Sequence, residues 1–375
     1  MKTNKLLIVI TFIATILFSV PFVLSSCNKT SGTITKEYID KIQLGKLIFF
    51  DVSLSNPIGQ SCGTCHSPST GFSDPLHNTV SGGAVSGLFG NRNAPIAAYA
   101  MFSPTFHLNI SDSTFIGGLF LDGRVNTLEE QAQKPFLNPL EMNNTNIEML
   151  INKLKNTSYY SLFKKVYGNF KDNNTAMSNI ADAISSYERS PDLNSFTSKF
   201  DYYLNGQATL NAQELRGLKL FTDTVRAKCG NCHLATPDDI SGRVLFTDFT
   251  YNNDGVPKNT FNPFYTIPAI NNPLGEKYID NGLGSILNDH SHDGEFRVPT
   301  LRNIALSAPY FHNGVFGTLE EVVHFYNVRD VAGSGIAKPE VASNVDTEET
   351  GNLHLTAQEE ADIVAFMKTL TDGYK

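Results

Sequence analysis

SCGTCHSPSTGF, residues 61–72, contains two cysteines separated by two residues and a histidine directly after the second, and KCGNCHLA, residues 228–235, repeats this order. C-x-x-C-H is the attachment signature of c-type haem. Two thiols at this spacing can bond the two vinyl groups on one edge of a porphyrin, and the adjacent histidine can give an imidazole nitrogen to the iron. The sequence therefore predicts two covalently attached haem c groups. The predicted attachment residues are Cys62, Cys65, Cys229 and Cys232, and the predicted proximal iron ligands are His66 and His233.

The positions of the paired cysteines match other roles less well. A zinc site built from two C-x-x-C pairs has them about 15–20 residues apart, whereas Cys62 and Cys229 are 167 residues apart. A thioredoxin-like motif would lie in a β-α-β context, which the surrounding sequence does not predict. Disulfides or a bound metal remain the alternatives to haem.

The first 27 residues predict a lipoprotein signal peptide. A short positive start, MKTNK, precedes an apolar run, and LSSC at 24–27 resembles a bacterial lipobox, which would make Cys27 a lipidated N-terminus. The run is long enough to span a bilayer, so an uncleaved anchor is the alternative. Both interpretations place the remaining chain outside the cytoplasm. The lipobox followed by Asn28 favours a periplasmic protein held by its lipid at the outer membrane.

Composition bears on the partners of the protein. Without Lys2 and Lys5 the chain has 27 basic and 37 acidic side chains, a formal charge of −10. It has no basic cluster, so nucleic acid is not an expected partner. One lipid and two haems account for all five cysteines, and the chain contains no tryptophan.

The sequence predicts a mainly α-helical protein of two cytochrome-c-like haem domains related by duplication, with long loops and little strand. The segments before the two haem motifs are similar. A second similarity follows each motif: FLDGRVNTLEEQ (120–131) is similar to FHNGVFGTLEEV (311–322), and we call this pair of segments the echo. An Arg-Asn pair lies between haem motif and echo in each half, at 92–93 and at 302–303. Convergent helix capping by the threonine is the alternative for the echo alone. The predicted segments are the signal peptide 1–27, a first haem domain 28–200 and a second haem domain 201–375.

Helical periodicity supports this fold class. Apolar residues recur at helical spacing over 147–154 and 177–187. Residues 356–359 form a capping box at the start of a C-terminal helix. Long loops rich in Gly, Asn and Pro, 69–115 and 234–297, are expected to wrap the haems.

Taken together, these segments resemble the bacterial di-haem cytochrome c peroxidases, a family that includes MauG. The resemblance covers nearly all of the mature chain and rests on GKLIFFDVSLS, CGTCH, GFSD, RNAP, DGRVNTLEEQAQKPFLNPLEM, CGNCH and FRVPTLRNIALSAPYFHNGVFGTLEEVVHFYN. It implies a peroxide site at the first haem and an electron-accepting haem at the second. The implied partners are hydrogen peroxide and a small periplasmic electron donor, a cytochrome c or a cupredoxin. A homodimer is left open.

The resemblance also implies roles for single residues. Glu141 would be the acid–base group that assists cleavage of the O–O bond, and Gln131 would support the same pocket. Asn93 would be a ligand of one calcium ion. From the residues alone, a solvated surface acid is the favoured interpretation of Glu141, and turn capping is the alternative for Asn93.

Three positions depart from the family's pattern. Leu121 stands where the family often has a tryptophan between the haems, so electrons must tunnel directly or use another aromatic residue such as Phe120. Val85 lies about where many members have a distal histidine for the first haem. No methionine lies between Met177 and Met367, where the second haem would take its usual sixth ligand. The candidate sixth ligands are therefore His77 and His107 for the first haem, and His290, His292, Glu295 and Tyr310 for the second.

Three classes of function are compatible with these features. The leading one is a peroxidase that reduces hydrogen peroxide to water. The others are an oxidase that modifies another protein, as MauG does, and a non-enzymatic di-haem electron carrier or redox sensor. Glu141 with Gln131 favours an enzyme over a carrier, and the missing tryptophan favours a peroxidase over the MauG-like role.

Overall fold

The computed structural model describes residues 35–238 and 241–375. The predicted signal peptide and Cys27 lie outside these residues, so their interpretation stays a prediction. Within the described part of the chain, every helix is too short or too polar to cross a membrane.

The described residues are mainly helical, which confirms the predicted fold class. The α-helices are α1 (Lys36–Phe49), α2 (Cys62–Cys65), α3 (Leu128–Leu137), α4 (Ile147–Lys155), α5 (Tyr160–Tyr167), α6 (Asn173–Glu188), α7 (Lys199–Leu204), α8 (Ala212–Phe221), α9 (Cys229–Cys232), α10 (Leu283–Leu287), α11 (Leu319–Val328) and α12 (Ala357–Lys368). The short 3-10 helices are η1 (Val52–Leu54), η2 (Pro68–Thr70), η3 (Ala100–Phe102), η4 (Pro263–Thr266), η5 (Gly275–Lys277), η6 (His290–His292) and η7 (Ile304–Leu306).

In the described residues the strands are short, and they form two pairs, both antiparallel. The strands are β1 (His107–Asn109), β2 (Thr114–Ile116), β3 (Tyr251–Asn252) and β4 (Phe296–Arg297). In the first pair His107 faces Ile116, and in the second Tyr251 faces Arg297. The second pair brings the loop after α9 against the segment that leads into VPTLRN.

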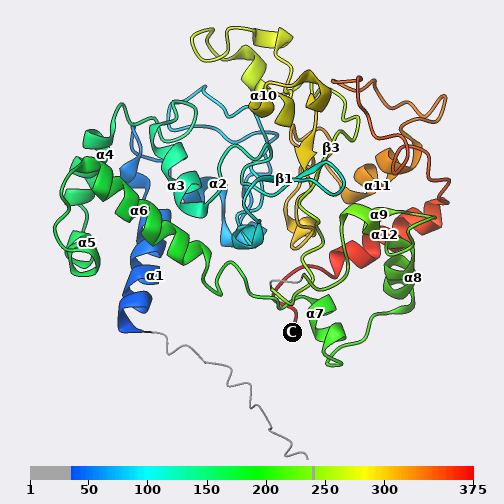
Figure 1. The fold of residues 1–375 in the computed structure, drawn as a ribbon, viewed down its shortest axis with the longest axis horizontal. Helices are drawn as coiled ribbons and strands as arrows, with labels where there is room; N and C mark the ends of the chain where they lie inside the picture. The colour runs from blue at the N-terminus through cyan, green and yellow to red at the C-terminus, as the bar shows by residue number, and fades with distance from the viewer. Residues whose placement is uncertain (1–34, 239–240) are drawn as a thin grey trace, which may run out of the picture. The chain divides into compact units, whose positions relative to one another are not determined.

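Two helix pairs, α1 with α6 and α8 with α12, are built in the same way (Figure 1). In each pair the two helices touch at a glycine. The close approach requires glycine, because a Cβ atom at this position would clash with the backbone of the partner helix. A Cβ on Gly45 of α1 would lie 1.9 Å from the carbonyl oxygen of Ala183 in α6. A Cβ on Gly217 of α8 would lie 1.9 Å from the carbonyl oxygen of Asp362 in α12. The similar segments before the two haem motifs therefore have the same packing role.

Residues from Lys36 onward form one compact unit, inside which most buried apolar side chains gather in two large cores. The first core takes its buried members from 44–193 and the second from 200–370. The predicted boundary between 200 and 201 lies next to this change of core. The division into two domains itself stays a prediction.

The echo at 120–131 and 311–322 has one backbone shape. Phe120 and Phe311 have φ of 60° and 66°. Thr127 caps α3 and Thr318 caps α11, each accepting a hydrogen bond of 3.1 Å from the backbone N–H three residues later. Convergent capping accounts for the threonines but not for the left-handed phenylalanine before each turn, so the geometry favours duplication.

The two Arg-Asn pairs both lie between haem motif and echo, as the sequence shows, but the backbone shows that they are not equivalent positions. Asn303 has φ of 61° and precedes η7, whereas the residue with φ of 63° before η3 is Tyr99. Asn303 therefore corresponds to Tyr99. Asn303 lies four residues after Pro299, and Tyr99 lies four residues after Pro95.

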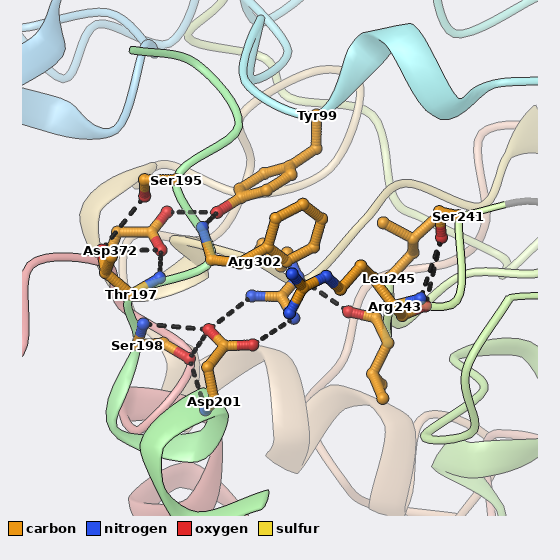
Figure 2. A network of polar contacts seen from close by, with 12 residues as sticks. Tyr99, Ser195, Thr197, Ser198, Asp201, Ser241, Arg243, Leu245, Arg302 and Asp372 are labelled. Carbon is orange, nitrogen blue, oxygen red and sulfur yellow. Dashed lines mark hydrogen bonds and ion pairs between the residues drawn. The ribbon is translucent and has the colours of Figure 1, made fainter. Parts of the chain in front are cut away.

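These two corresponding residues meet at one carboxylate near the C-terminus, that of Asp372, which Figure 2 shows beside Tyr99. The Tyr99 hydroxyl donates to Asp372 Oδ2 at 2.6 Å, and Asn303 Nδ2 donates to the same oxygen at 2.9 Å. The backbone N–H of Thr197, in the connection between the two cores, donates to Asp372 Oδ1 at 2.9 Å.

Candidate active site

Each C-x-x-C-H motif forms a single helical turn. These turns are α2 and α9, and in each the histidine N–H donates to the carbonyl of the first cysteine at 2.9 Å. Residues three apart in a helix lie on the same face. Both thiols of a motif therefore face one direction, as attachment to one porphyrin edge requires.

The two motif histidines are held by backbone carbonyls in the same way. His66 Nδ1 lies 3.1 Å from the carbonyl oxygen of Phe72, and His233 Nδ1 lies 2.8 Å from that of Phe246. A carbonyl can only accept, so Nδ1 carries the proton and Nε2 is left as a metal ligand. Burial lowers the pKa of both imidazoles, that of His233 to about 4, which keeps them neutral.

A cavity borders α9 and is mostly apolar. Cys229, Cys232 and His233 contribute to its wall, and so does Leu121 from the first half of the chain. Its apolar lining includes Phe249, Val298, Leu301, Leu319 and Val323. This is the environment that a porphyrin bound to α9 needs.

Glu141 lies beside the first motif. Asn138 Nδ2 donates to Glu141 Oε1 at 3.0 Å, and the Ala84 N–H donates to the Glu141 backbone carbonyl at 2.7 Å. Burial raises the pKa of the Glu141 carboxyl, although Asn138 acts to lower it. Burial and neighbouring acids, Glu141 among them, raise the pKa of the Cys65 thiol to about 11. The structure thus places this half-buried carboxyl near the first motif.

Gln131 lies in α3, half-buried, ten residues before Glu141. Among the hydrogen bonds of residues 35–238 and 241–375, none joins the two side chains. The helix itself packs on α6, so Gln131 has a fixed backbone position. Its supporting role stays a prediction.

Comparison with known proteins identifies the family. A model of the di-haem cytochrome c peroxidase family matches residues 39–209. MauG, the methylamine utilization protein of Paracoccus denitrificans, is 32% identical over 351 residues, which cover 88% of this chain and 88% of MauG. The chain belongs to the di-haem cytochrome c peroxidase family. Cytochrome-c peroxidase IdrP1 of Pseudomonas sp. strain SCT is 31% identical over 345 residues, which cover 88% of this chain and 81% of the relative.

A solved member of this group of proteins has a similar fold. The crystal structure of the diheme peroxidase BthA from Burkholderia thailandensis E264 superposes with a TM-score of 0.77 at 32% identity, covering 88% of this chain and 86% of BthA. The di-haem family implies two c-type haems and peroxidase-type oxidoreductase chemistry for this chain.

The two motifs fit these haems. Each offers two thiols on one face of a helical turn and a half-buried imidazole that bonds a backbone carbonyl through Nδ1, so that Nε2 can bind the iron. The cavity beside α9 provides an apolar wall for the second group. Covalent attachment through the four cysteines stays a prediction.

The candidate sixth ligands for the first haem lie at the surface. His77 and His107 are both exposed. His77 Nδ1 is 2.8 Å from the carbonyl oxygen of Ala308, and His107 Nδ1 is 2.8 Å from that of Thr105. Neither observation supports them as ligands.

The candidates for the second haem also have other partners. His290 pairs with Asp293 at 2.9 Å, and His292 pairs with Glu295 at 2.8 Å. Of the described residues in this segment, Gly294 and Phe296 line the cavity beside α9, whereas His290, His292 and Glu295 do not. Tyr310 does line the cavity, and its hydroxyl donates to the carbonyl of Ile304 at 3.0 Å.

Two further side chains, Tyr326 and Met367, line the cavity beside the second motif. Tyr326 of α11 is half-buried in the cavity wall, and its hydroxyl donates to Asp254 Oδ2 at 3.1 Å. Burial and Asp254 raise the Tyr326 pKa, with smaller contributions from Cys229 and Cys232. Met367 of α12 also lines the cavity. The helical spacing of Leu319, Val323 and Tyr326 is the signal that could have indicated Tyr326, since it puts all three on one face.

Asn93 lines the same cavity and is buried. Its Nδ2 lies 3.2 Å from the carbonyl oxygens of Asn78 and Thr79, which leaves Oδ1 as the atom available to a cation. Within the described residues, no three His, Cys, Asp or Glu side chains gather as a metal site. A calcium ion at Asn93 therefore stays a prediction and would need carbonyl or water ligands.

Proposed function

We propose that this protein reduces hydrogen peroxide to water, with the peroxide site at the haem of His66 and the haem of His233 accepting electrons from a small donor. The observation that carries the proposal is Glu141, a half-buried acid beside the first motif whose carboxylate accepts a hydrogen bond from Asn138. An electron carrier has no need of an acid–base group there.

The reaction consumes two electrons and two protons for each peroxide and releases two waters. When bound, the haem supplies the electrons for O–O cleavage. Glu141 takes the proton from one peroxide oxygen and returns it to the other, which leaves as water. Burial, by raising the pKa of Glu141, makes the carboxyl able to hold that proton during the transfer.

Oxidation of a protein substrate is the second candidate function. The similarity to MauG supports it, because this similarity extends over 88% of the chain. Leu121 opposes it, since this aliphatic side chain, which lines the cavity beside the second motif, cannot carry a radical. We therefore place peroxide reduction first.

A Glu141→Gln variant tests the proposal in steady-state peroxide reduction with an artificial donor. General acid–base groups contribute about 10²–10⁴-fold, so we expect kcat/KM for peroxide to fall in that range while both haems and their spectra are retained. Such a loss corresponds to about 4 kcal/mol of transition-state stabilisation at the centre of the range. Glu148→Gln is the matched control, because Glu148 is an exposed acid of α4.

Unchanged turnover in the Glu141 variant would make Glu141 a structural acid. A wild-type protein without turnover, in both the oxidised and the half-reduced state, would favour the electron carrier.

We also propose a periplasmic location with a lipid on Cys27 as the membrane anchor. The lipobox LSSC is the supporting observation. Cys27→Ser should move the protein from the outer-membrane fraction to the soluble periplasmic fraction. Recovery of the variant in membranes would favour an uncleaved helix instead.

A further inference from the structure

Arg302 is a fully buried cation whose donors are directed at two different segments. Its side chain is 1% exposed. Its Nη1 and Nη2 donate to the two carboxylate oxygens of Asp201 at 2.9 and 2.8 Å, and its Nε donates to the carbonyl of Val244 at 2.7 Å. Figure 2 shows the guanidinium between Asp201 and the segment that contains Leu245.

The surroundings of Arg302 fix it in one orientation. The guanidinium carbon lies 4.4 Å from the ring centroid of Phe196 and 5.2 Å from that of Tyr99. Ser198 Oγ donates to Asp201 Oδ2 at 2.6 Å, which orients the carboxylate in turn. Burying an ion pair costs desolvation energy, and apolar residues of similar size often serve stability as well. The pair is therefore better explained by what it positions than by stability.

The segment that it positions holds the second proximal histidine. Arg302 fixes the carbonyl of Val244, and Thr300 Oγ1 donates to the next carbonyl, that of Leu245, at 2.6 Å. The carbonyl that follows, of Phe246, accepts from His233 Nδ1 at 2.8 Å. Three consecutive carbonyls are thus each given a fixed donor.

We propose that Arg302, paired with Asp201, is a positioning residue for His233 and thereby sets the reduction potential of the second haem. The proposal rests on His233 as the proximal ligand in the proposed function. A hydrogen bond at Nδ1 increases the basicity of the imidazole, which stabilises the ferric iron and lowers its potential. When the Phe246 carbonyl moves away, the potential of this haem should rise.

The first haem provides an internal comparison. The carbonyl of Phe72 holds His66 as that of Phe246 holds His233, but the carbonyl two residues before it, that of Thr70, accepts from the uncharged Ser73 Oγ at 2.8 Å, where that of Val244 accepts from Arg302. Ala98 precedes Tyr99 as Arg302 precedes Asn303, so the repeat has alanine at the corresponding place. The effect of Arg302 should therefore be confined to the second haem.

Redox titration of the holoprotein by absorbance and EPR tests this proposal in the variants Asp201→Asn and Arg302→Lys. We expect the potential of the second haem to rise by about 59 mV, a tenfold change in its reduction equilibrium. The potential of the first haem should not change. Lys199→Gln is the matched control, because Lys199 lies on the same helix as Asp201 but pairs with Glu214 at 2.6 Å.

A milder variant keeps the test informative if the buried pair is required for folding. Thr300→Val keeps the buried ion pair, removes the hydrogen bond to the Leu245 carbonyl and the one that Thr300 Oγ1 accepts from the Arg302 N–H at 3.2 Å, and should raise the same potential by a smaller amount. Unchanged potentials in folded variants would overturn the proposal, and so would equal shifts at both haems or a shift in the Lys199 control. These measurements need no peroxide, so an absence of peroxidase turnover would contradict the proposed function without affecting this result.

Discussion

The glycine at each helix crossing gives a prediction whose size follows from one distance. In Gly45→Ala the new Cβ would start 1.9 Å from the carbonyl oxygen of Ala183, whereas real Cβ contacts are essentially never under 3.0 Å. α1 and α6 must then separate by at least about 1.1 Å at the core. The obstacle is backbone, so no side chain can rotate to make room.

Overpacking of this kind typically costs about 1–3 kcal/mol. Alanine favours the helix over glycine by about 1 kcal/mol, which offsets part of the cost. Because the clash is with a helix backbone and the site is fully enclosed, we expect Gly45→Ala to lower the free energy of unfolding by about 3 kcal/mol before this offset and about 2 kcal/mol after it.

Urea unfolding of the holoprotein, followed by far-ultraviolet circular dichroism, measures this cost. Gly217→Ala should have a similar cost, since its Cβ would also start 1.9 Å from a carbonyl oxygen. Gly90→Ala is the control, because the nearest atoms to its added Cβ are 3.8 Å away. Equal stability of the Gly45 and Gly90 variants would refute the packing argument.

Three further results are expected. Mass spectrometry of protein made with a c-haem maturation system should show two haem masses that survive denaturation, and one or none would contradict the double attachment. The weak red absorption band of ferric His/Met haem should be missing, because Tyr326 offers oxygen rather than sulfur; if the band is present and Met367→Leu removes it, Met367 is the ligand. Burial raises the pKa of Glu188 to about 8. The folded state therefore keeps a proton that the unfolded state loses above about pH 4.3. The free energy of unfolding should fall by up to about 1.4 kcal/mol per pH unit as the pH rises towards 8. Urea unfolding should show a flatter pH dependence in Glu188→Gln, and an unchanged slope would contradict this assignment.

The haem motifs and the fold class could be predicted because local chemistry determines them. Attachment to one porphyrin edge needs two thiols on one helical turn, and that spacing is visible in the letters around Cys62 and Cys229. The crossing helices were indicated by similar segments that end in the motifs. What the segments pack against was not visible, because Ala183 and Asp362 lie far from their glycines in sequence.

The candidate sixth ligands show where local reasoning fails. The position just before VPTLRN suggests His292 and Glu295 as ligands, but these two side chains pair with each other. The cavity wall is instead completed by Tyr326 and Met367, from helices that follow later in the chain. Long-range packing decides which side chain meets a haem, and one sequence does not encode that packing in any short pattern.

The two Arg-Asn pairs illustrate a second limit. The same letters at 92–93 and 302–303 suggested equivalence, whereas the left-handed backbone of Tyr99 and Asn303 identifies the corresponding positions. Unlike residues can fill one conformational role after duplication, so letter identity misleads where backbone shape is retained.

The shared carboxylate of Asp372 has a consequence for the inheritance of the two repeats. The hydroxyl of Tyr99 and the amide of Asn303 both depend on this one acceptor. A gene for residues 28–200 alone would encode Tyr99 without Asp372, the acid that accepts the hydrogen bond of its hydroxyl. Recombination that replaced either repeat with a foreign copy would have to bring a residue that fits Asp372. The two halves therefore depend on one another at this carboxylate, although each has its own helix crossing and its own core.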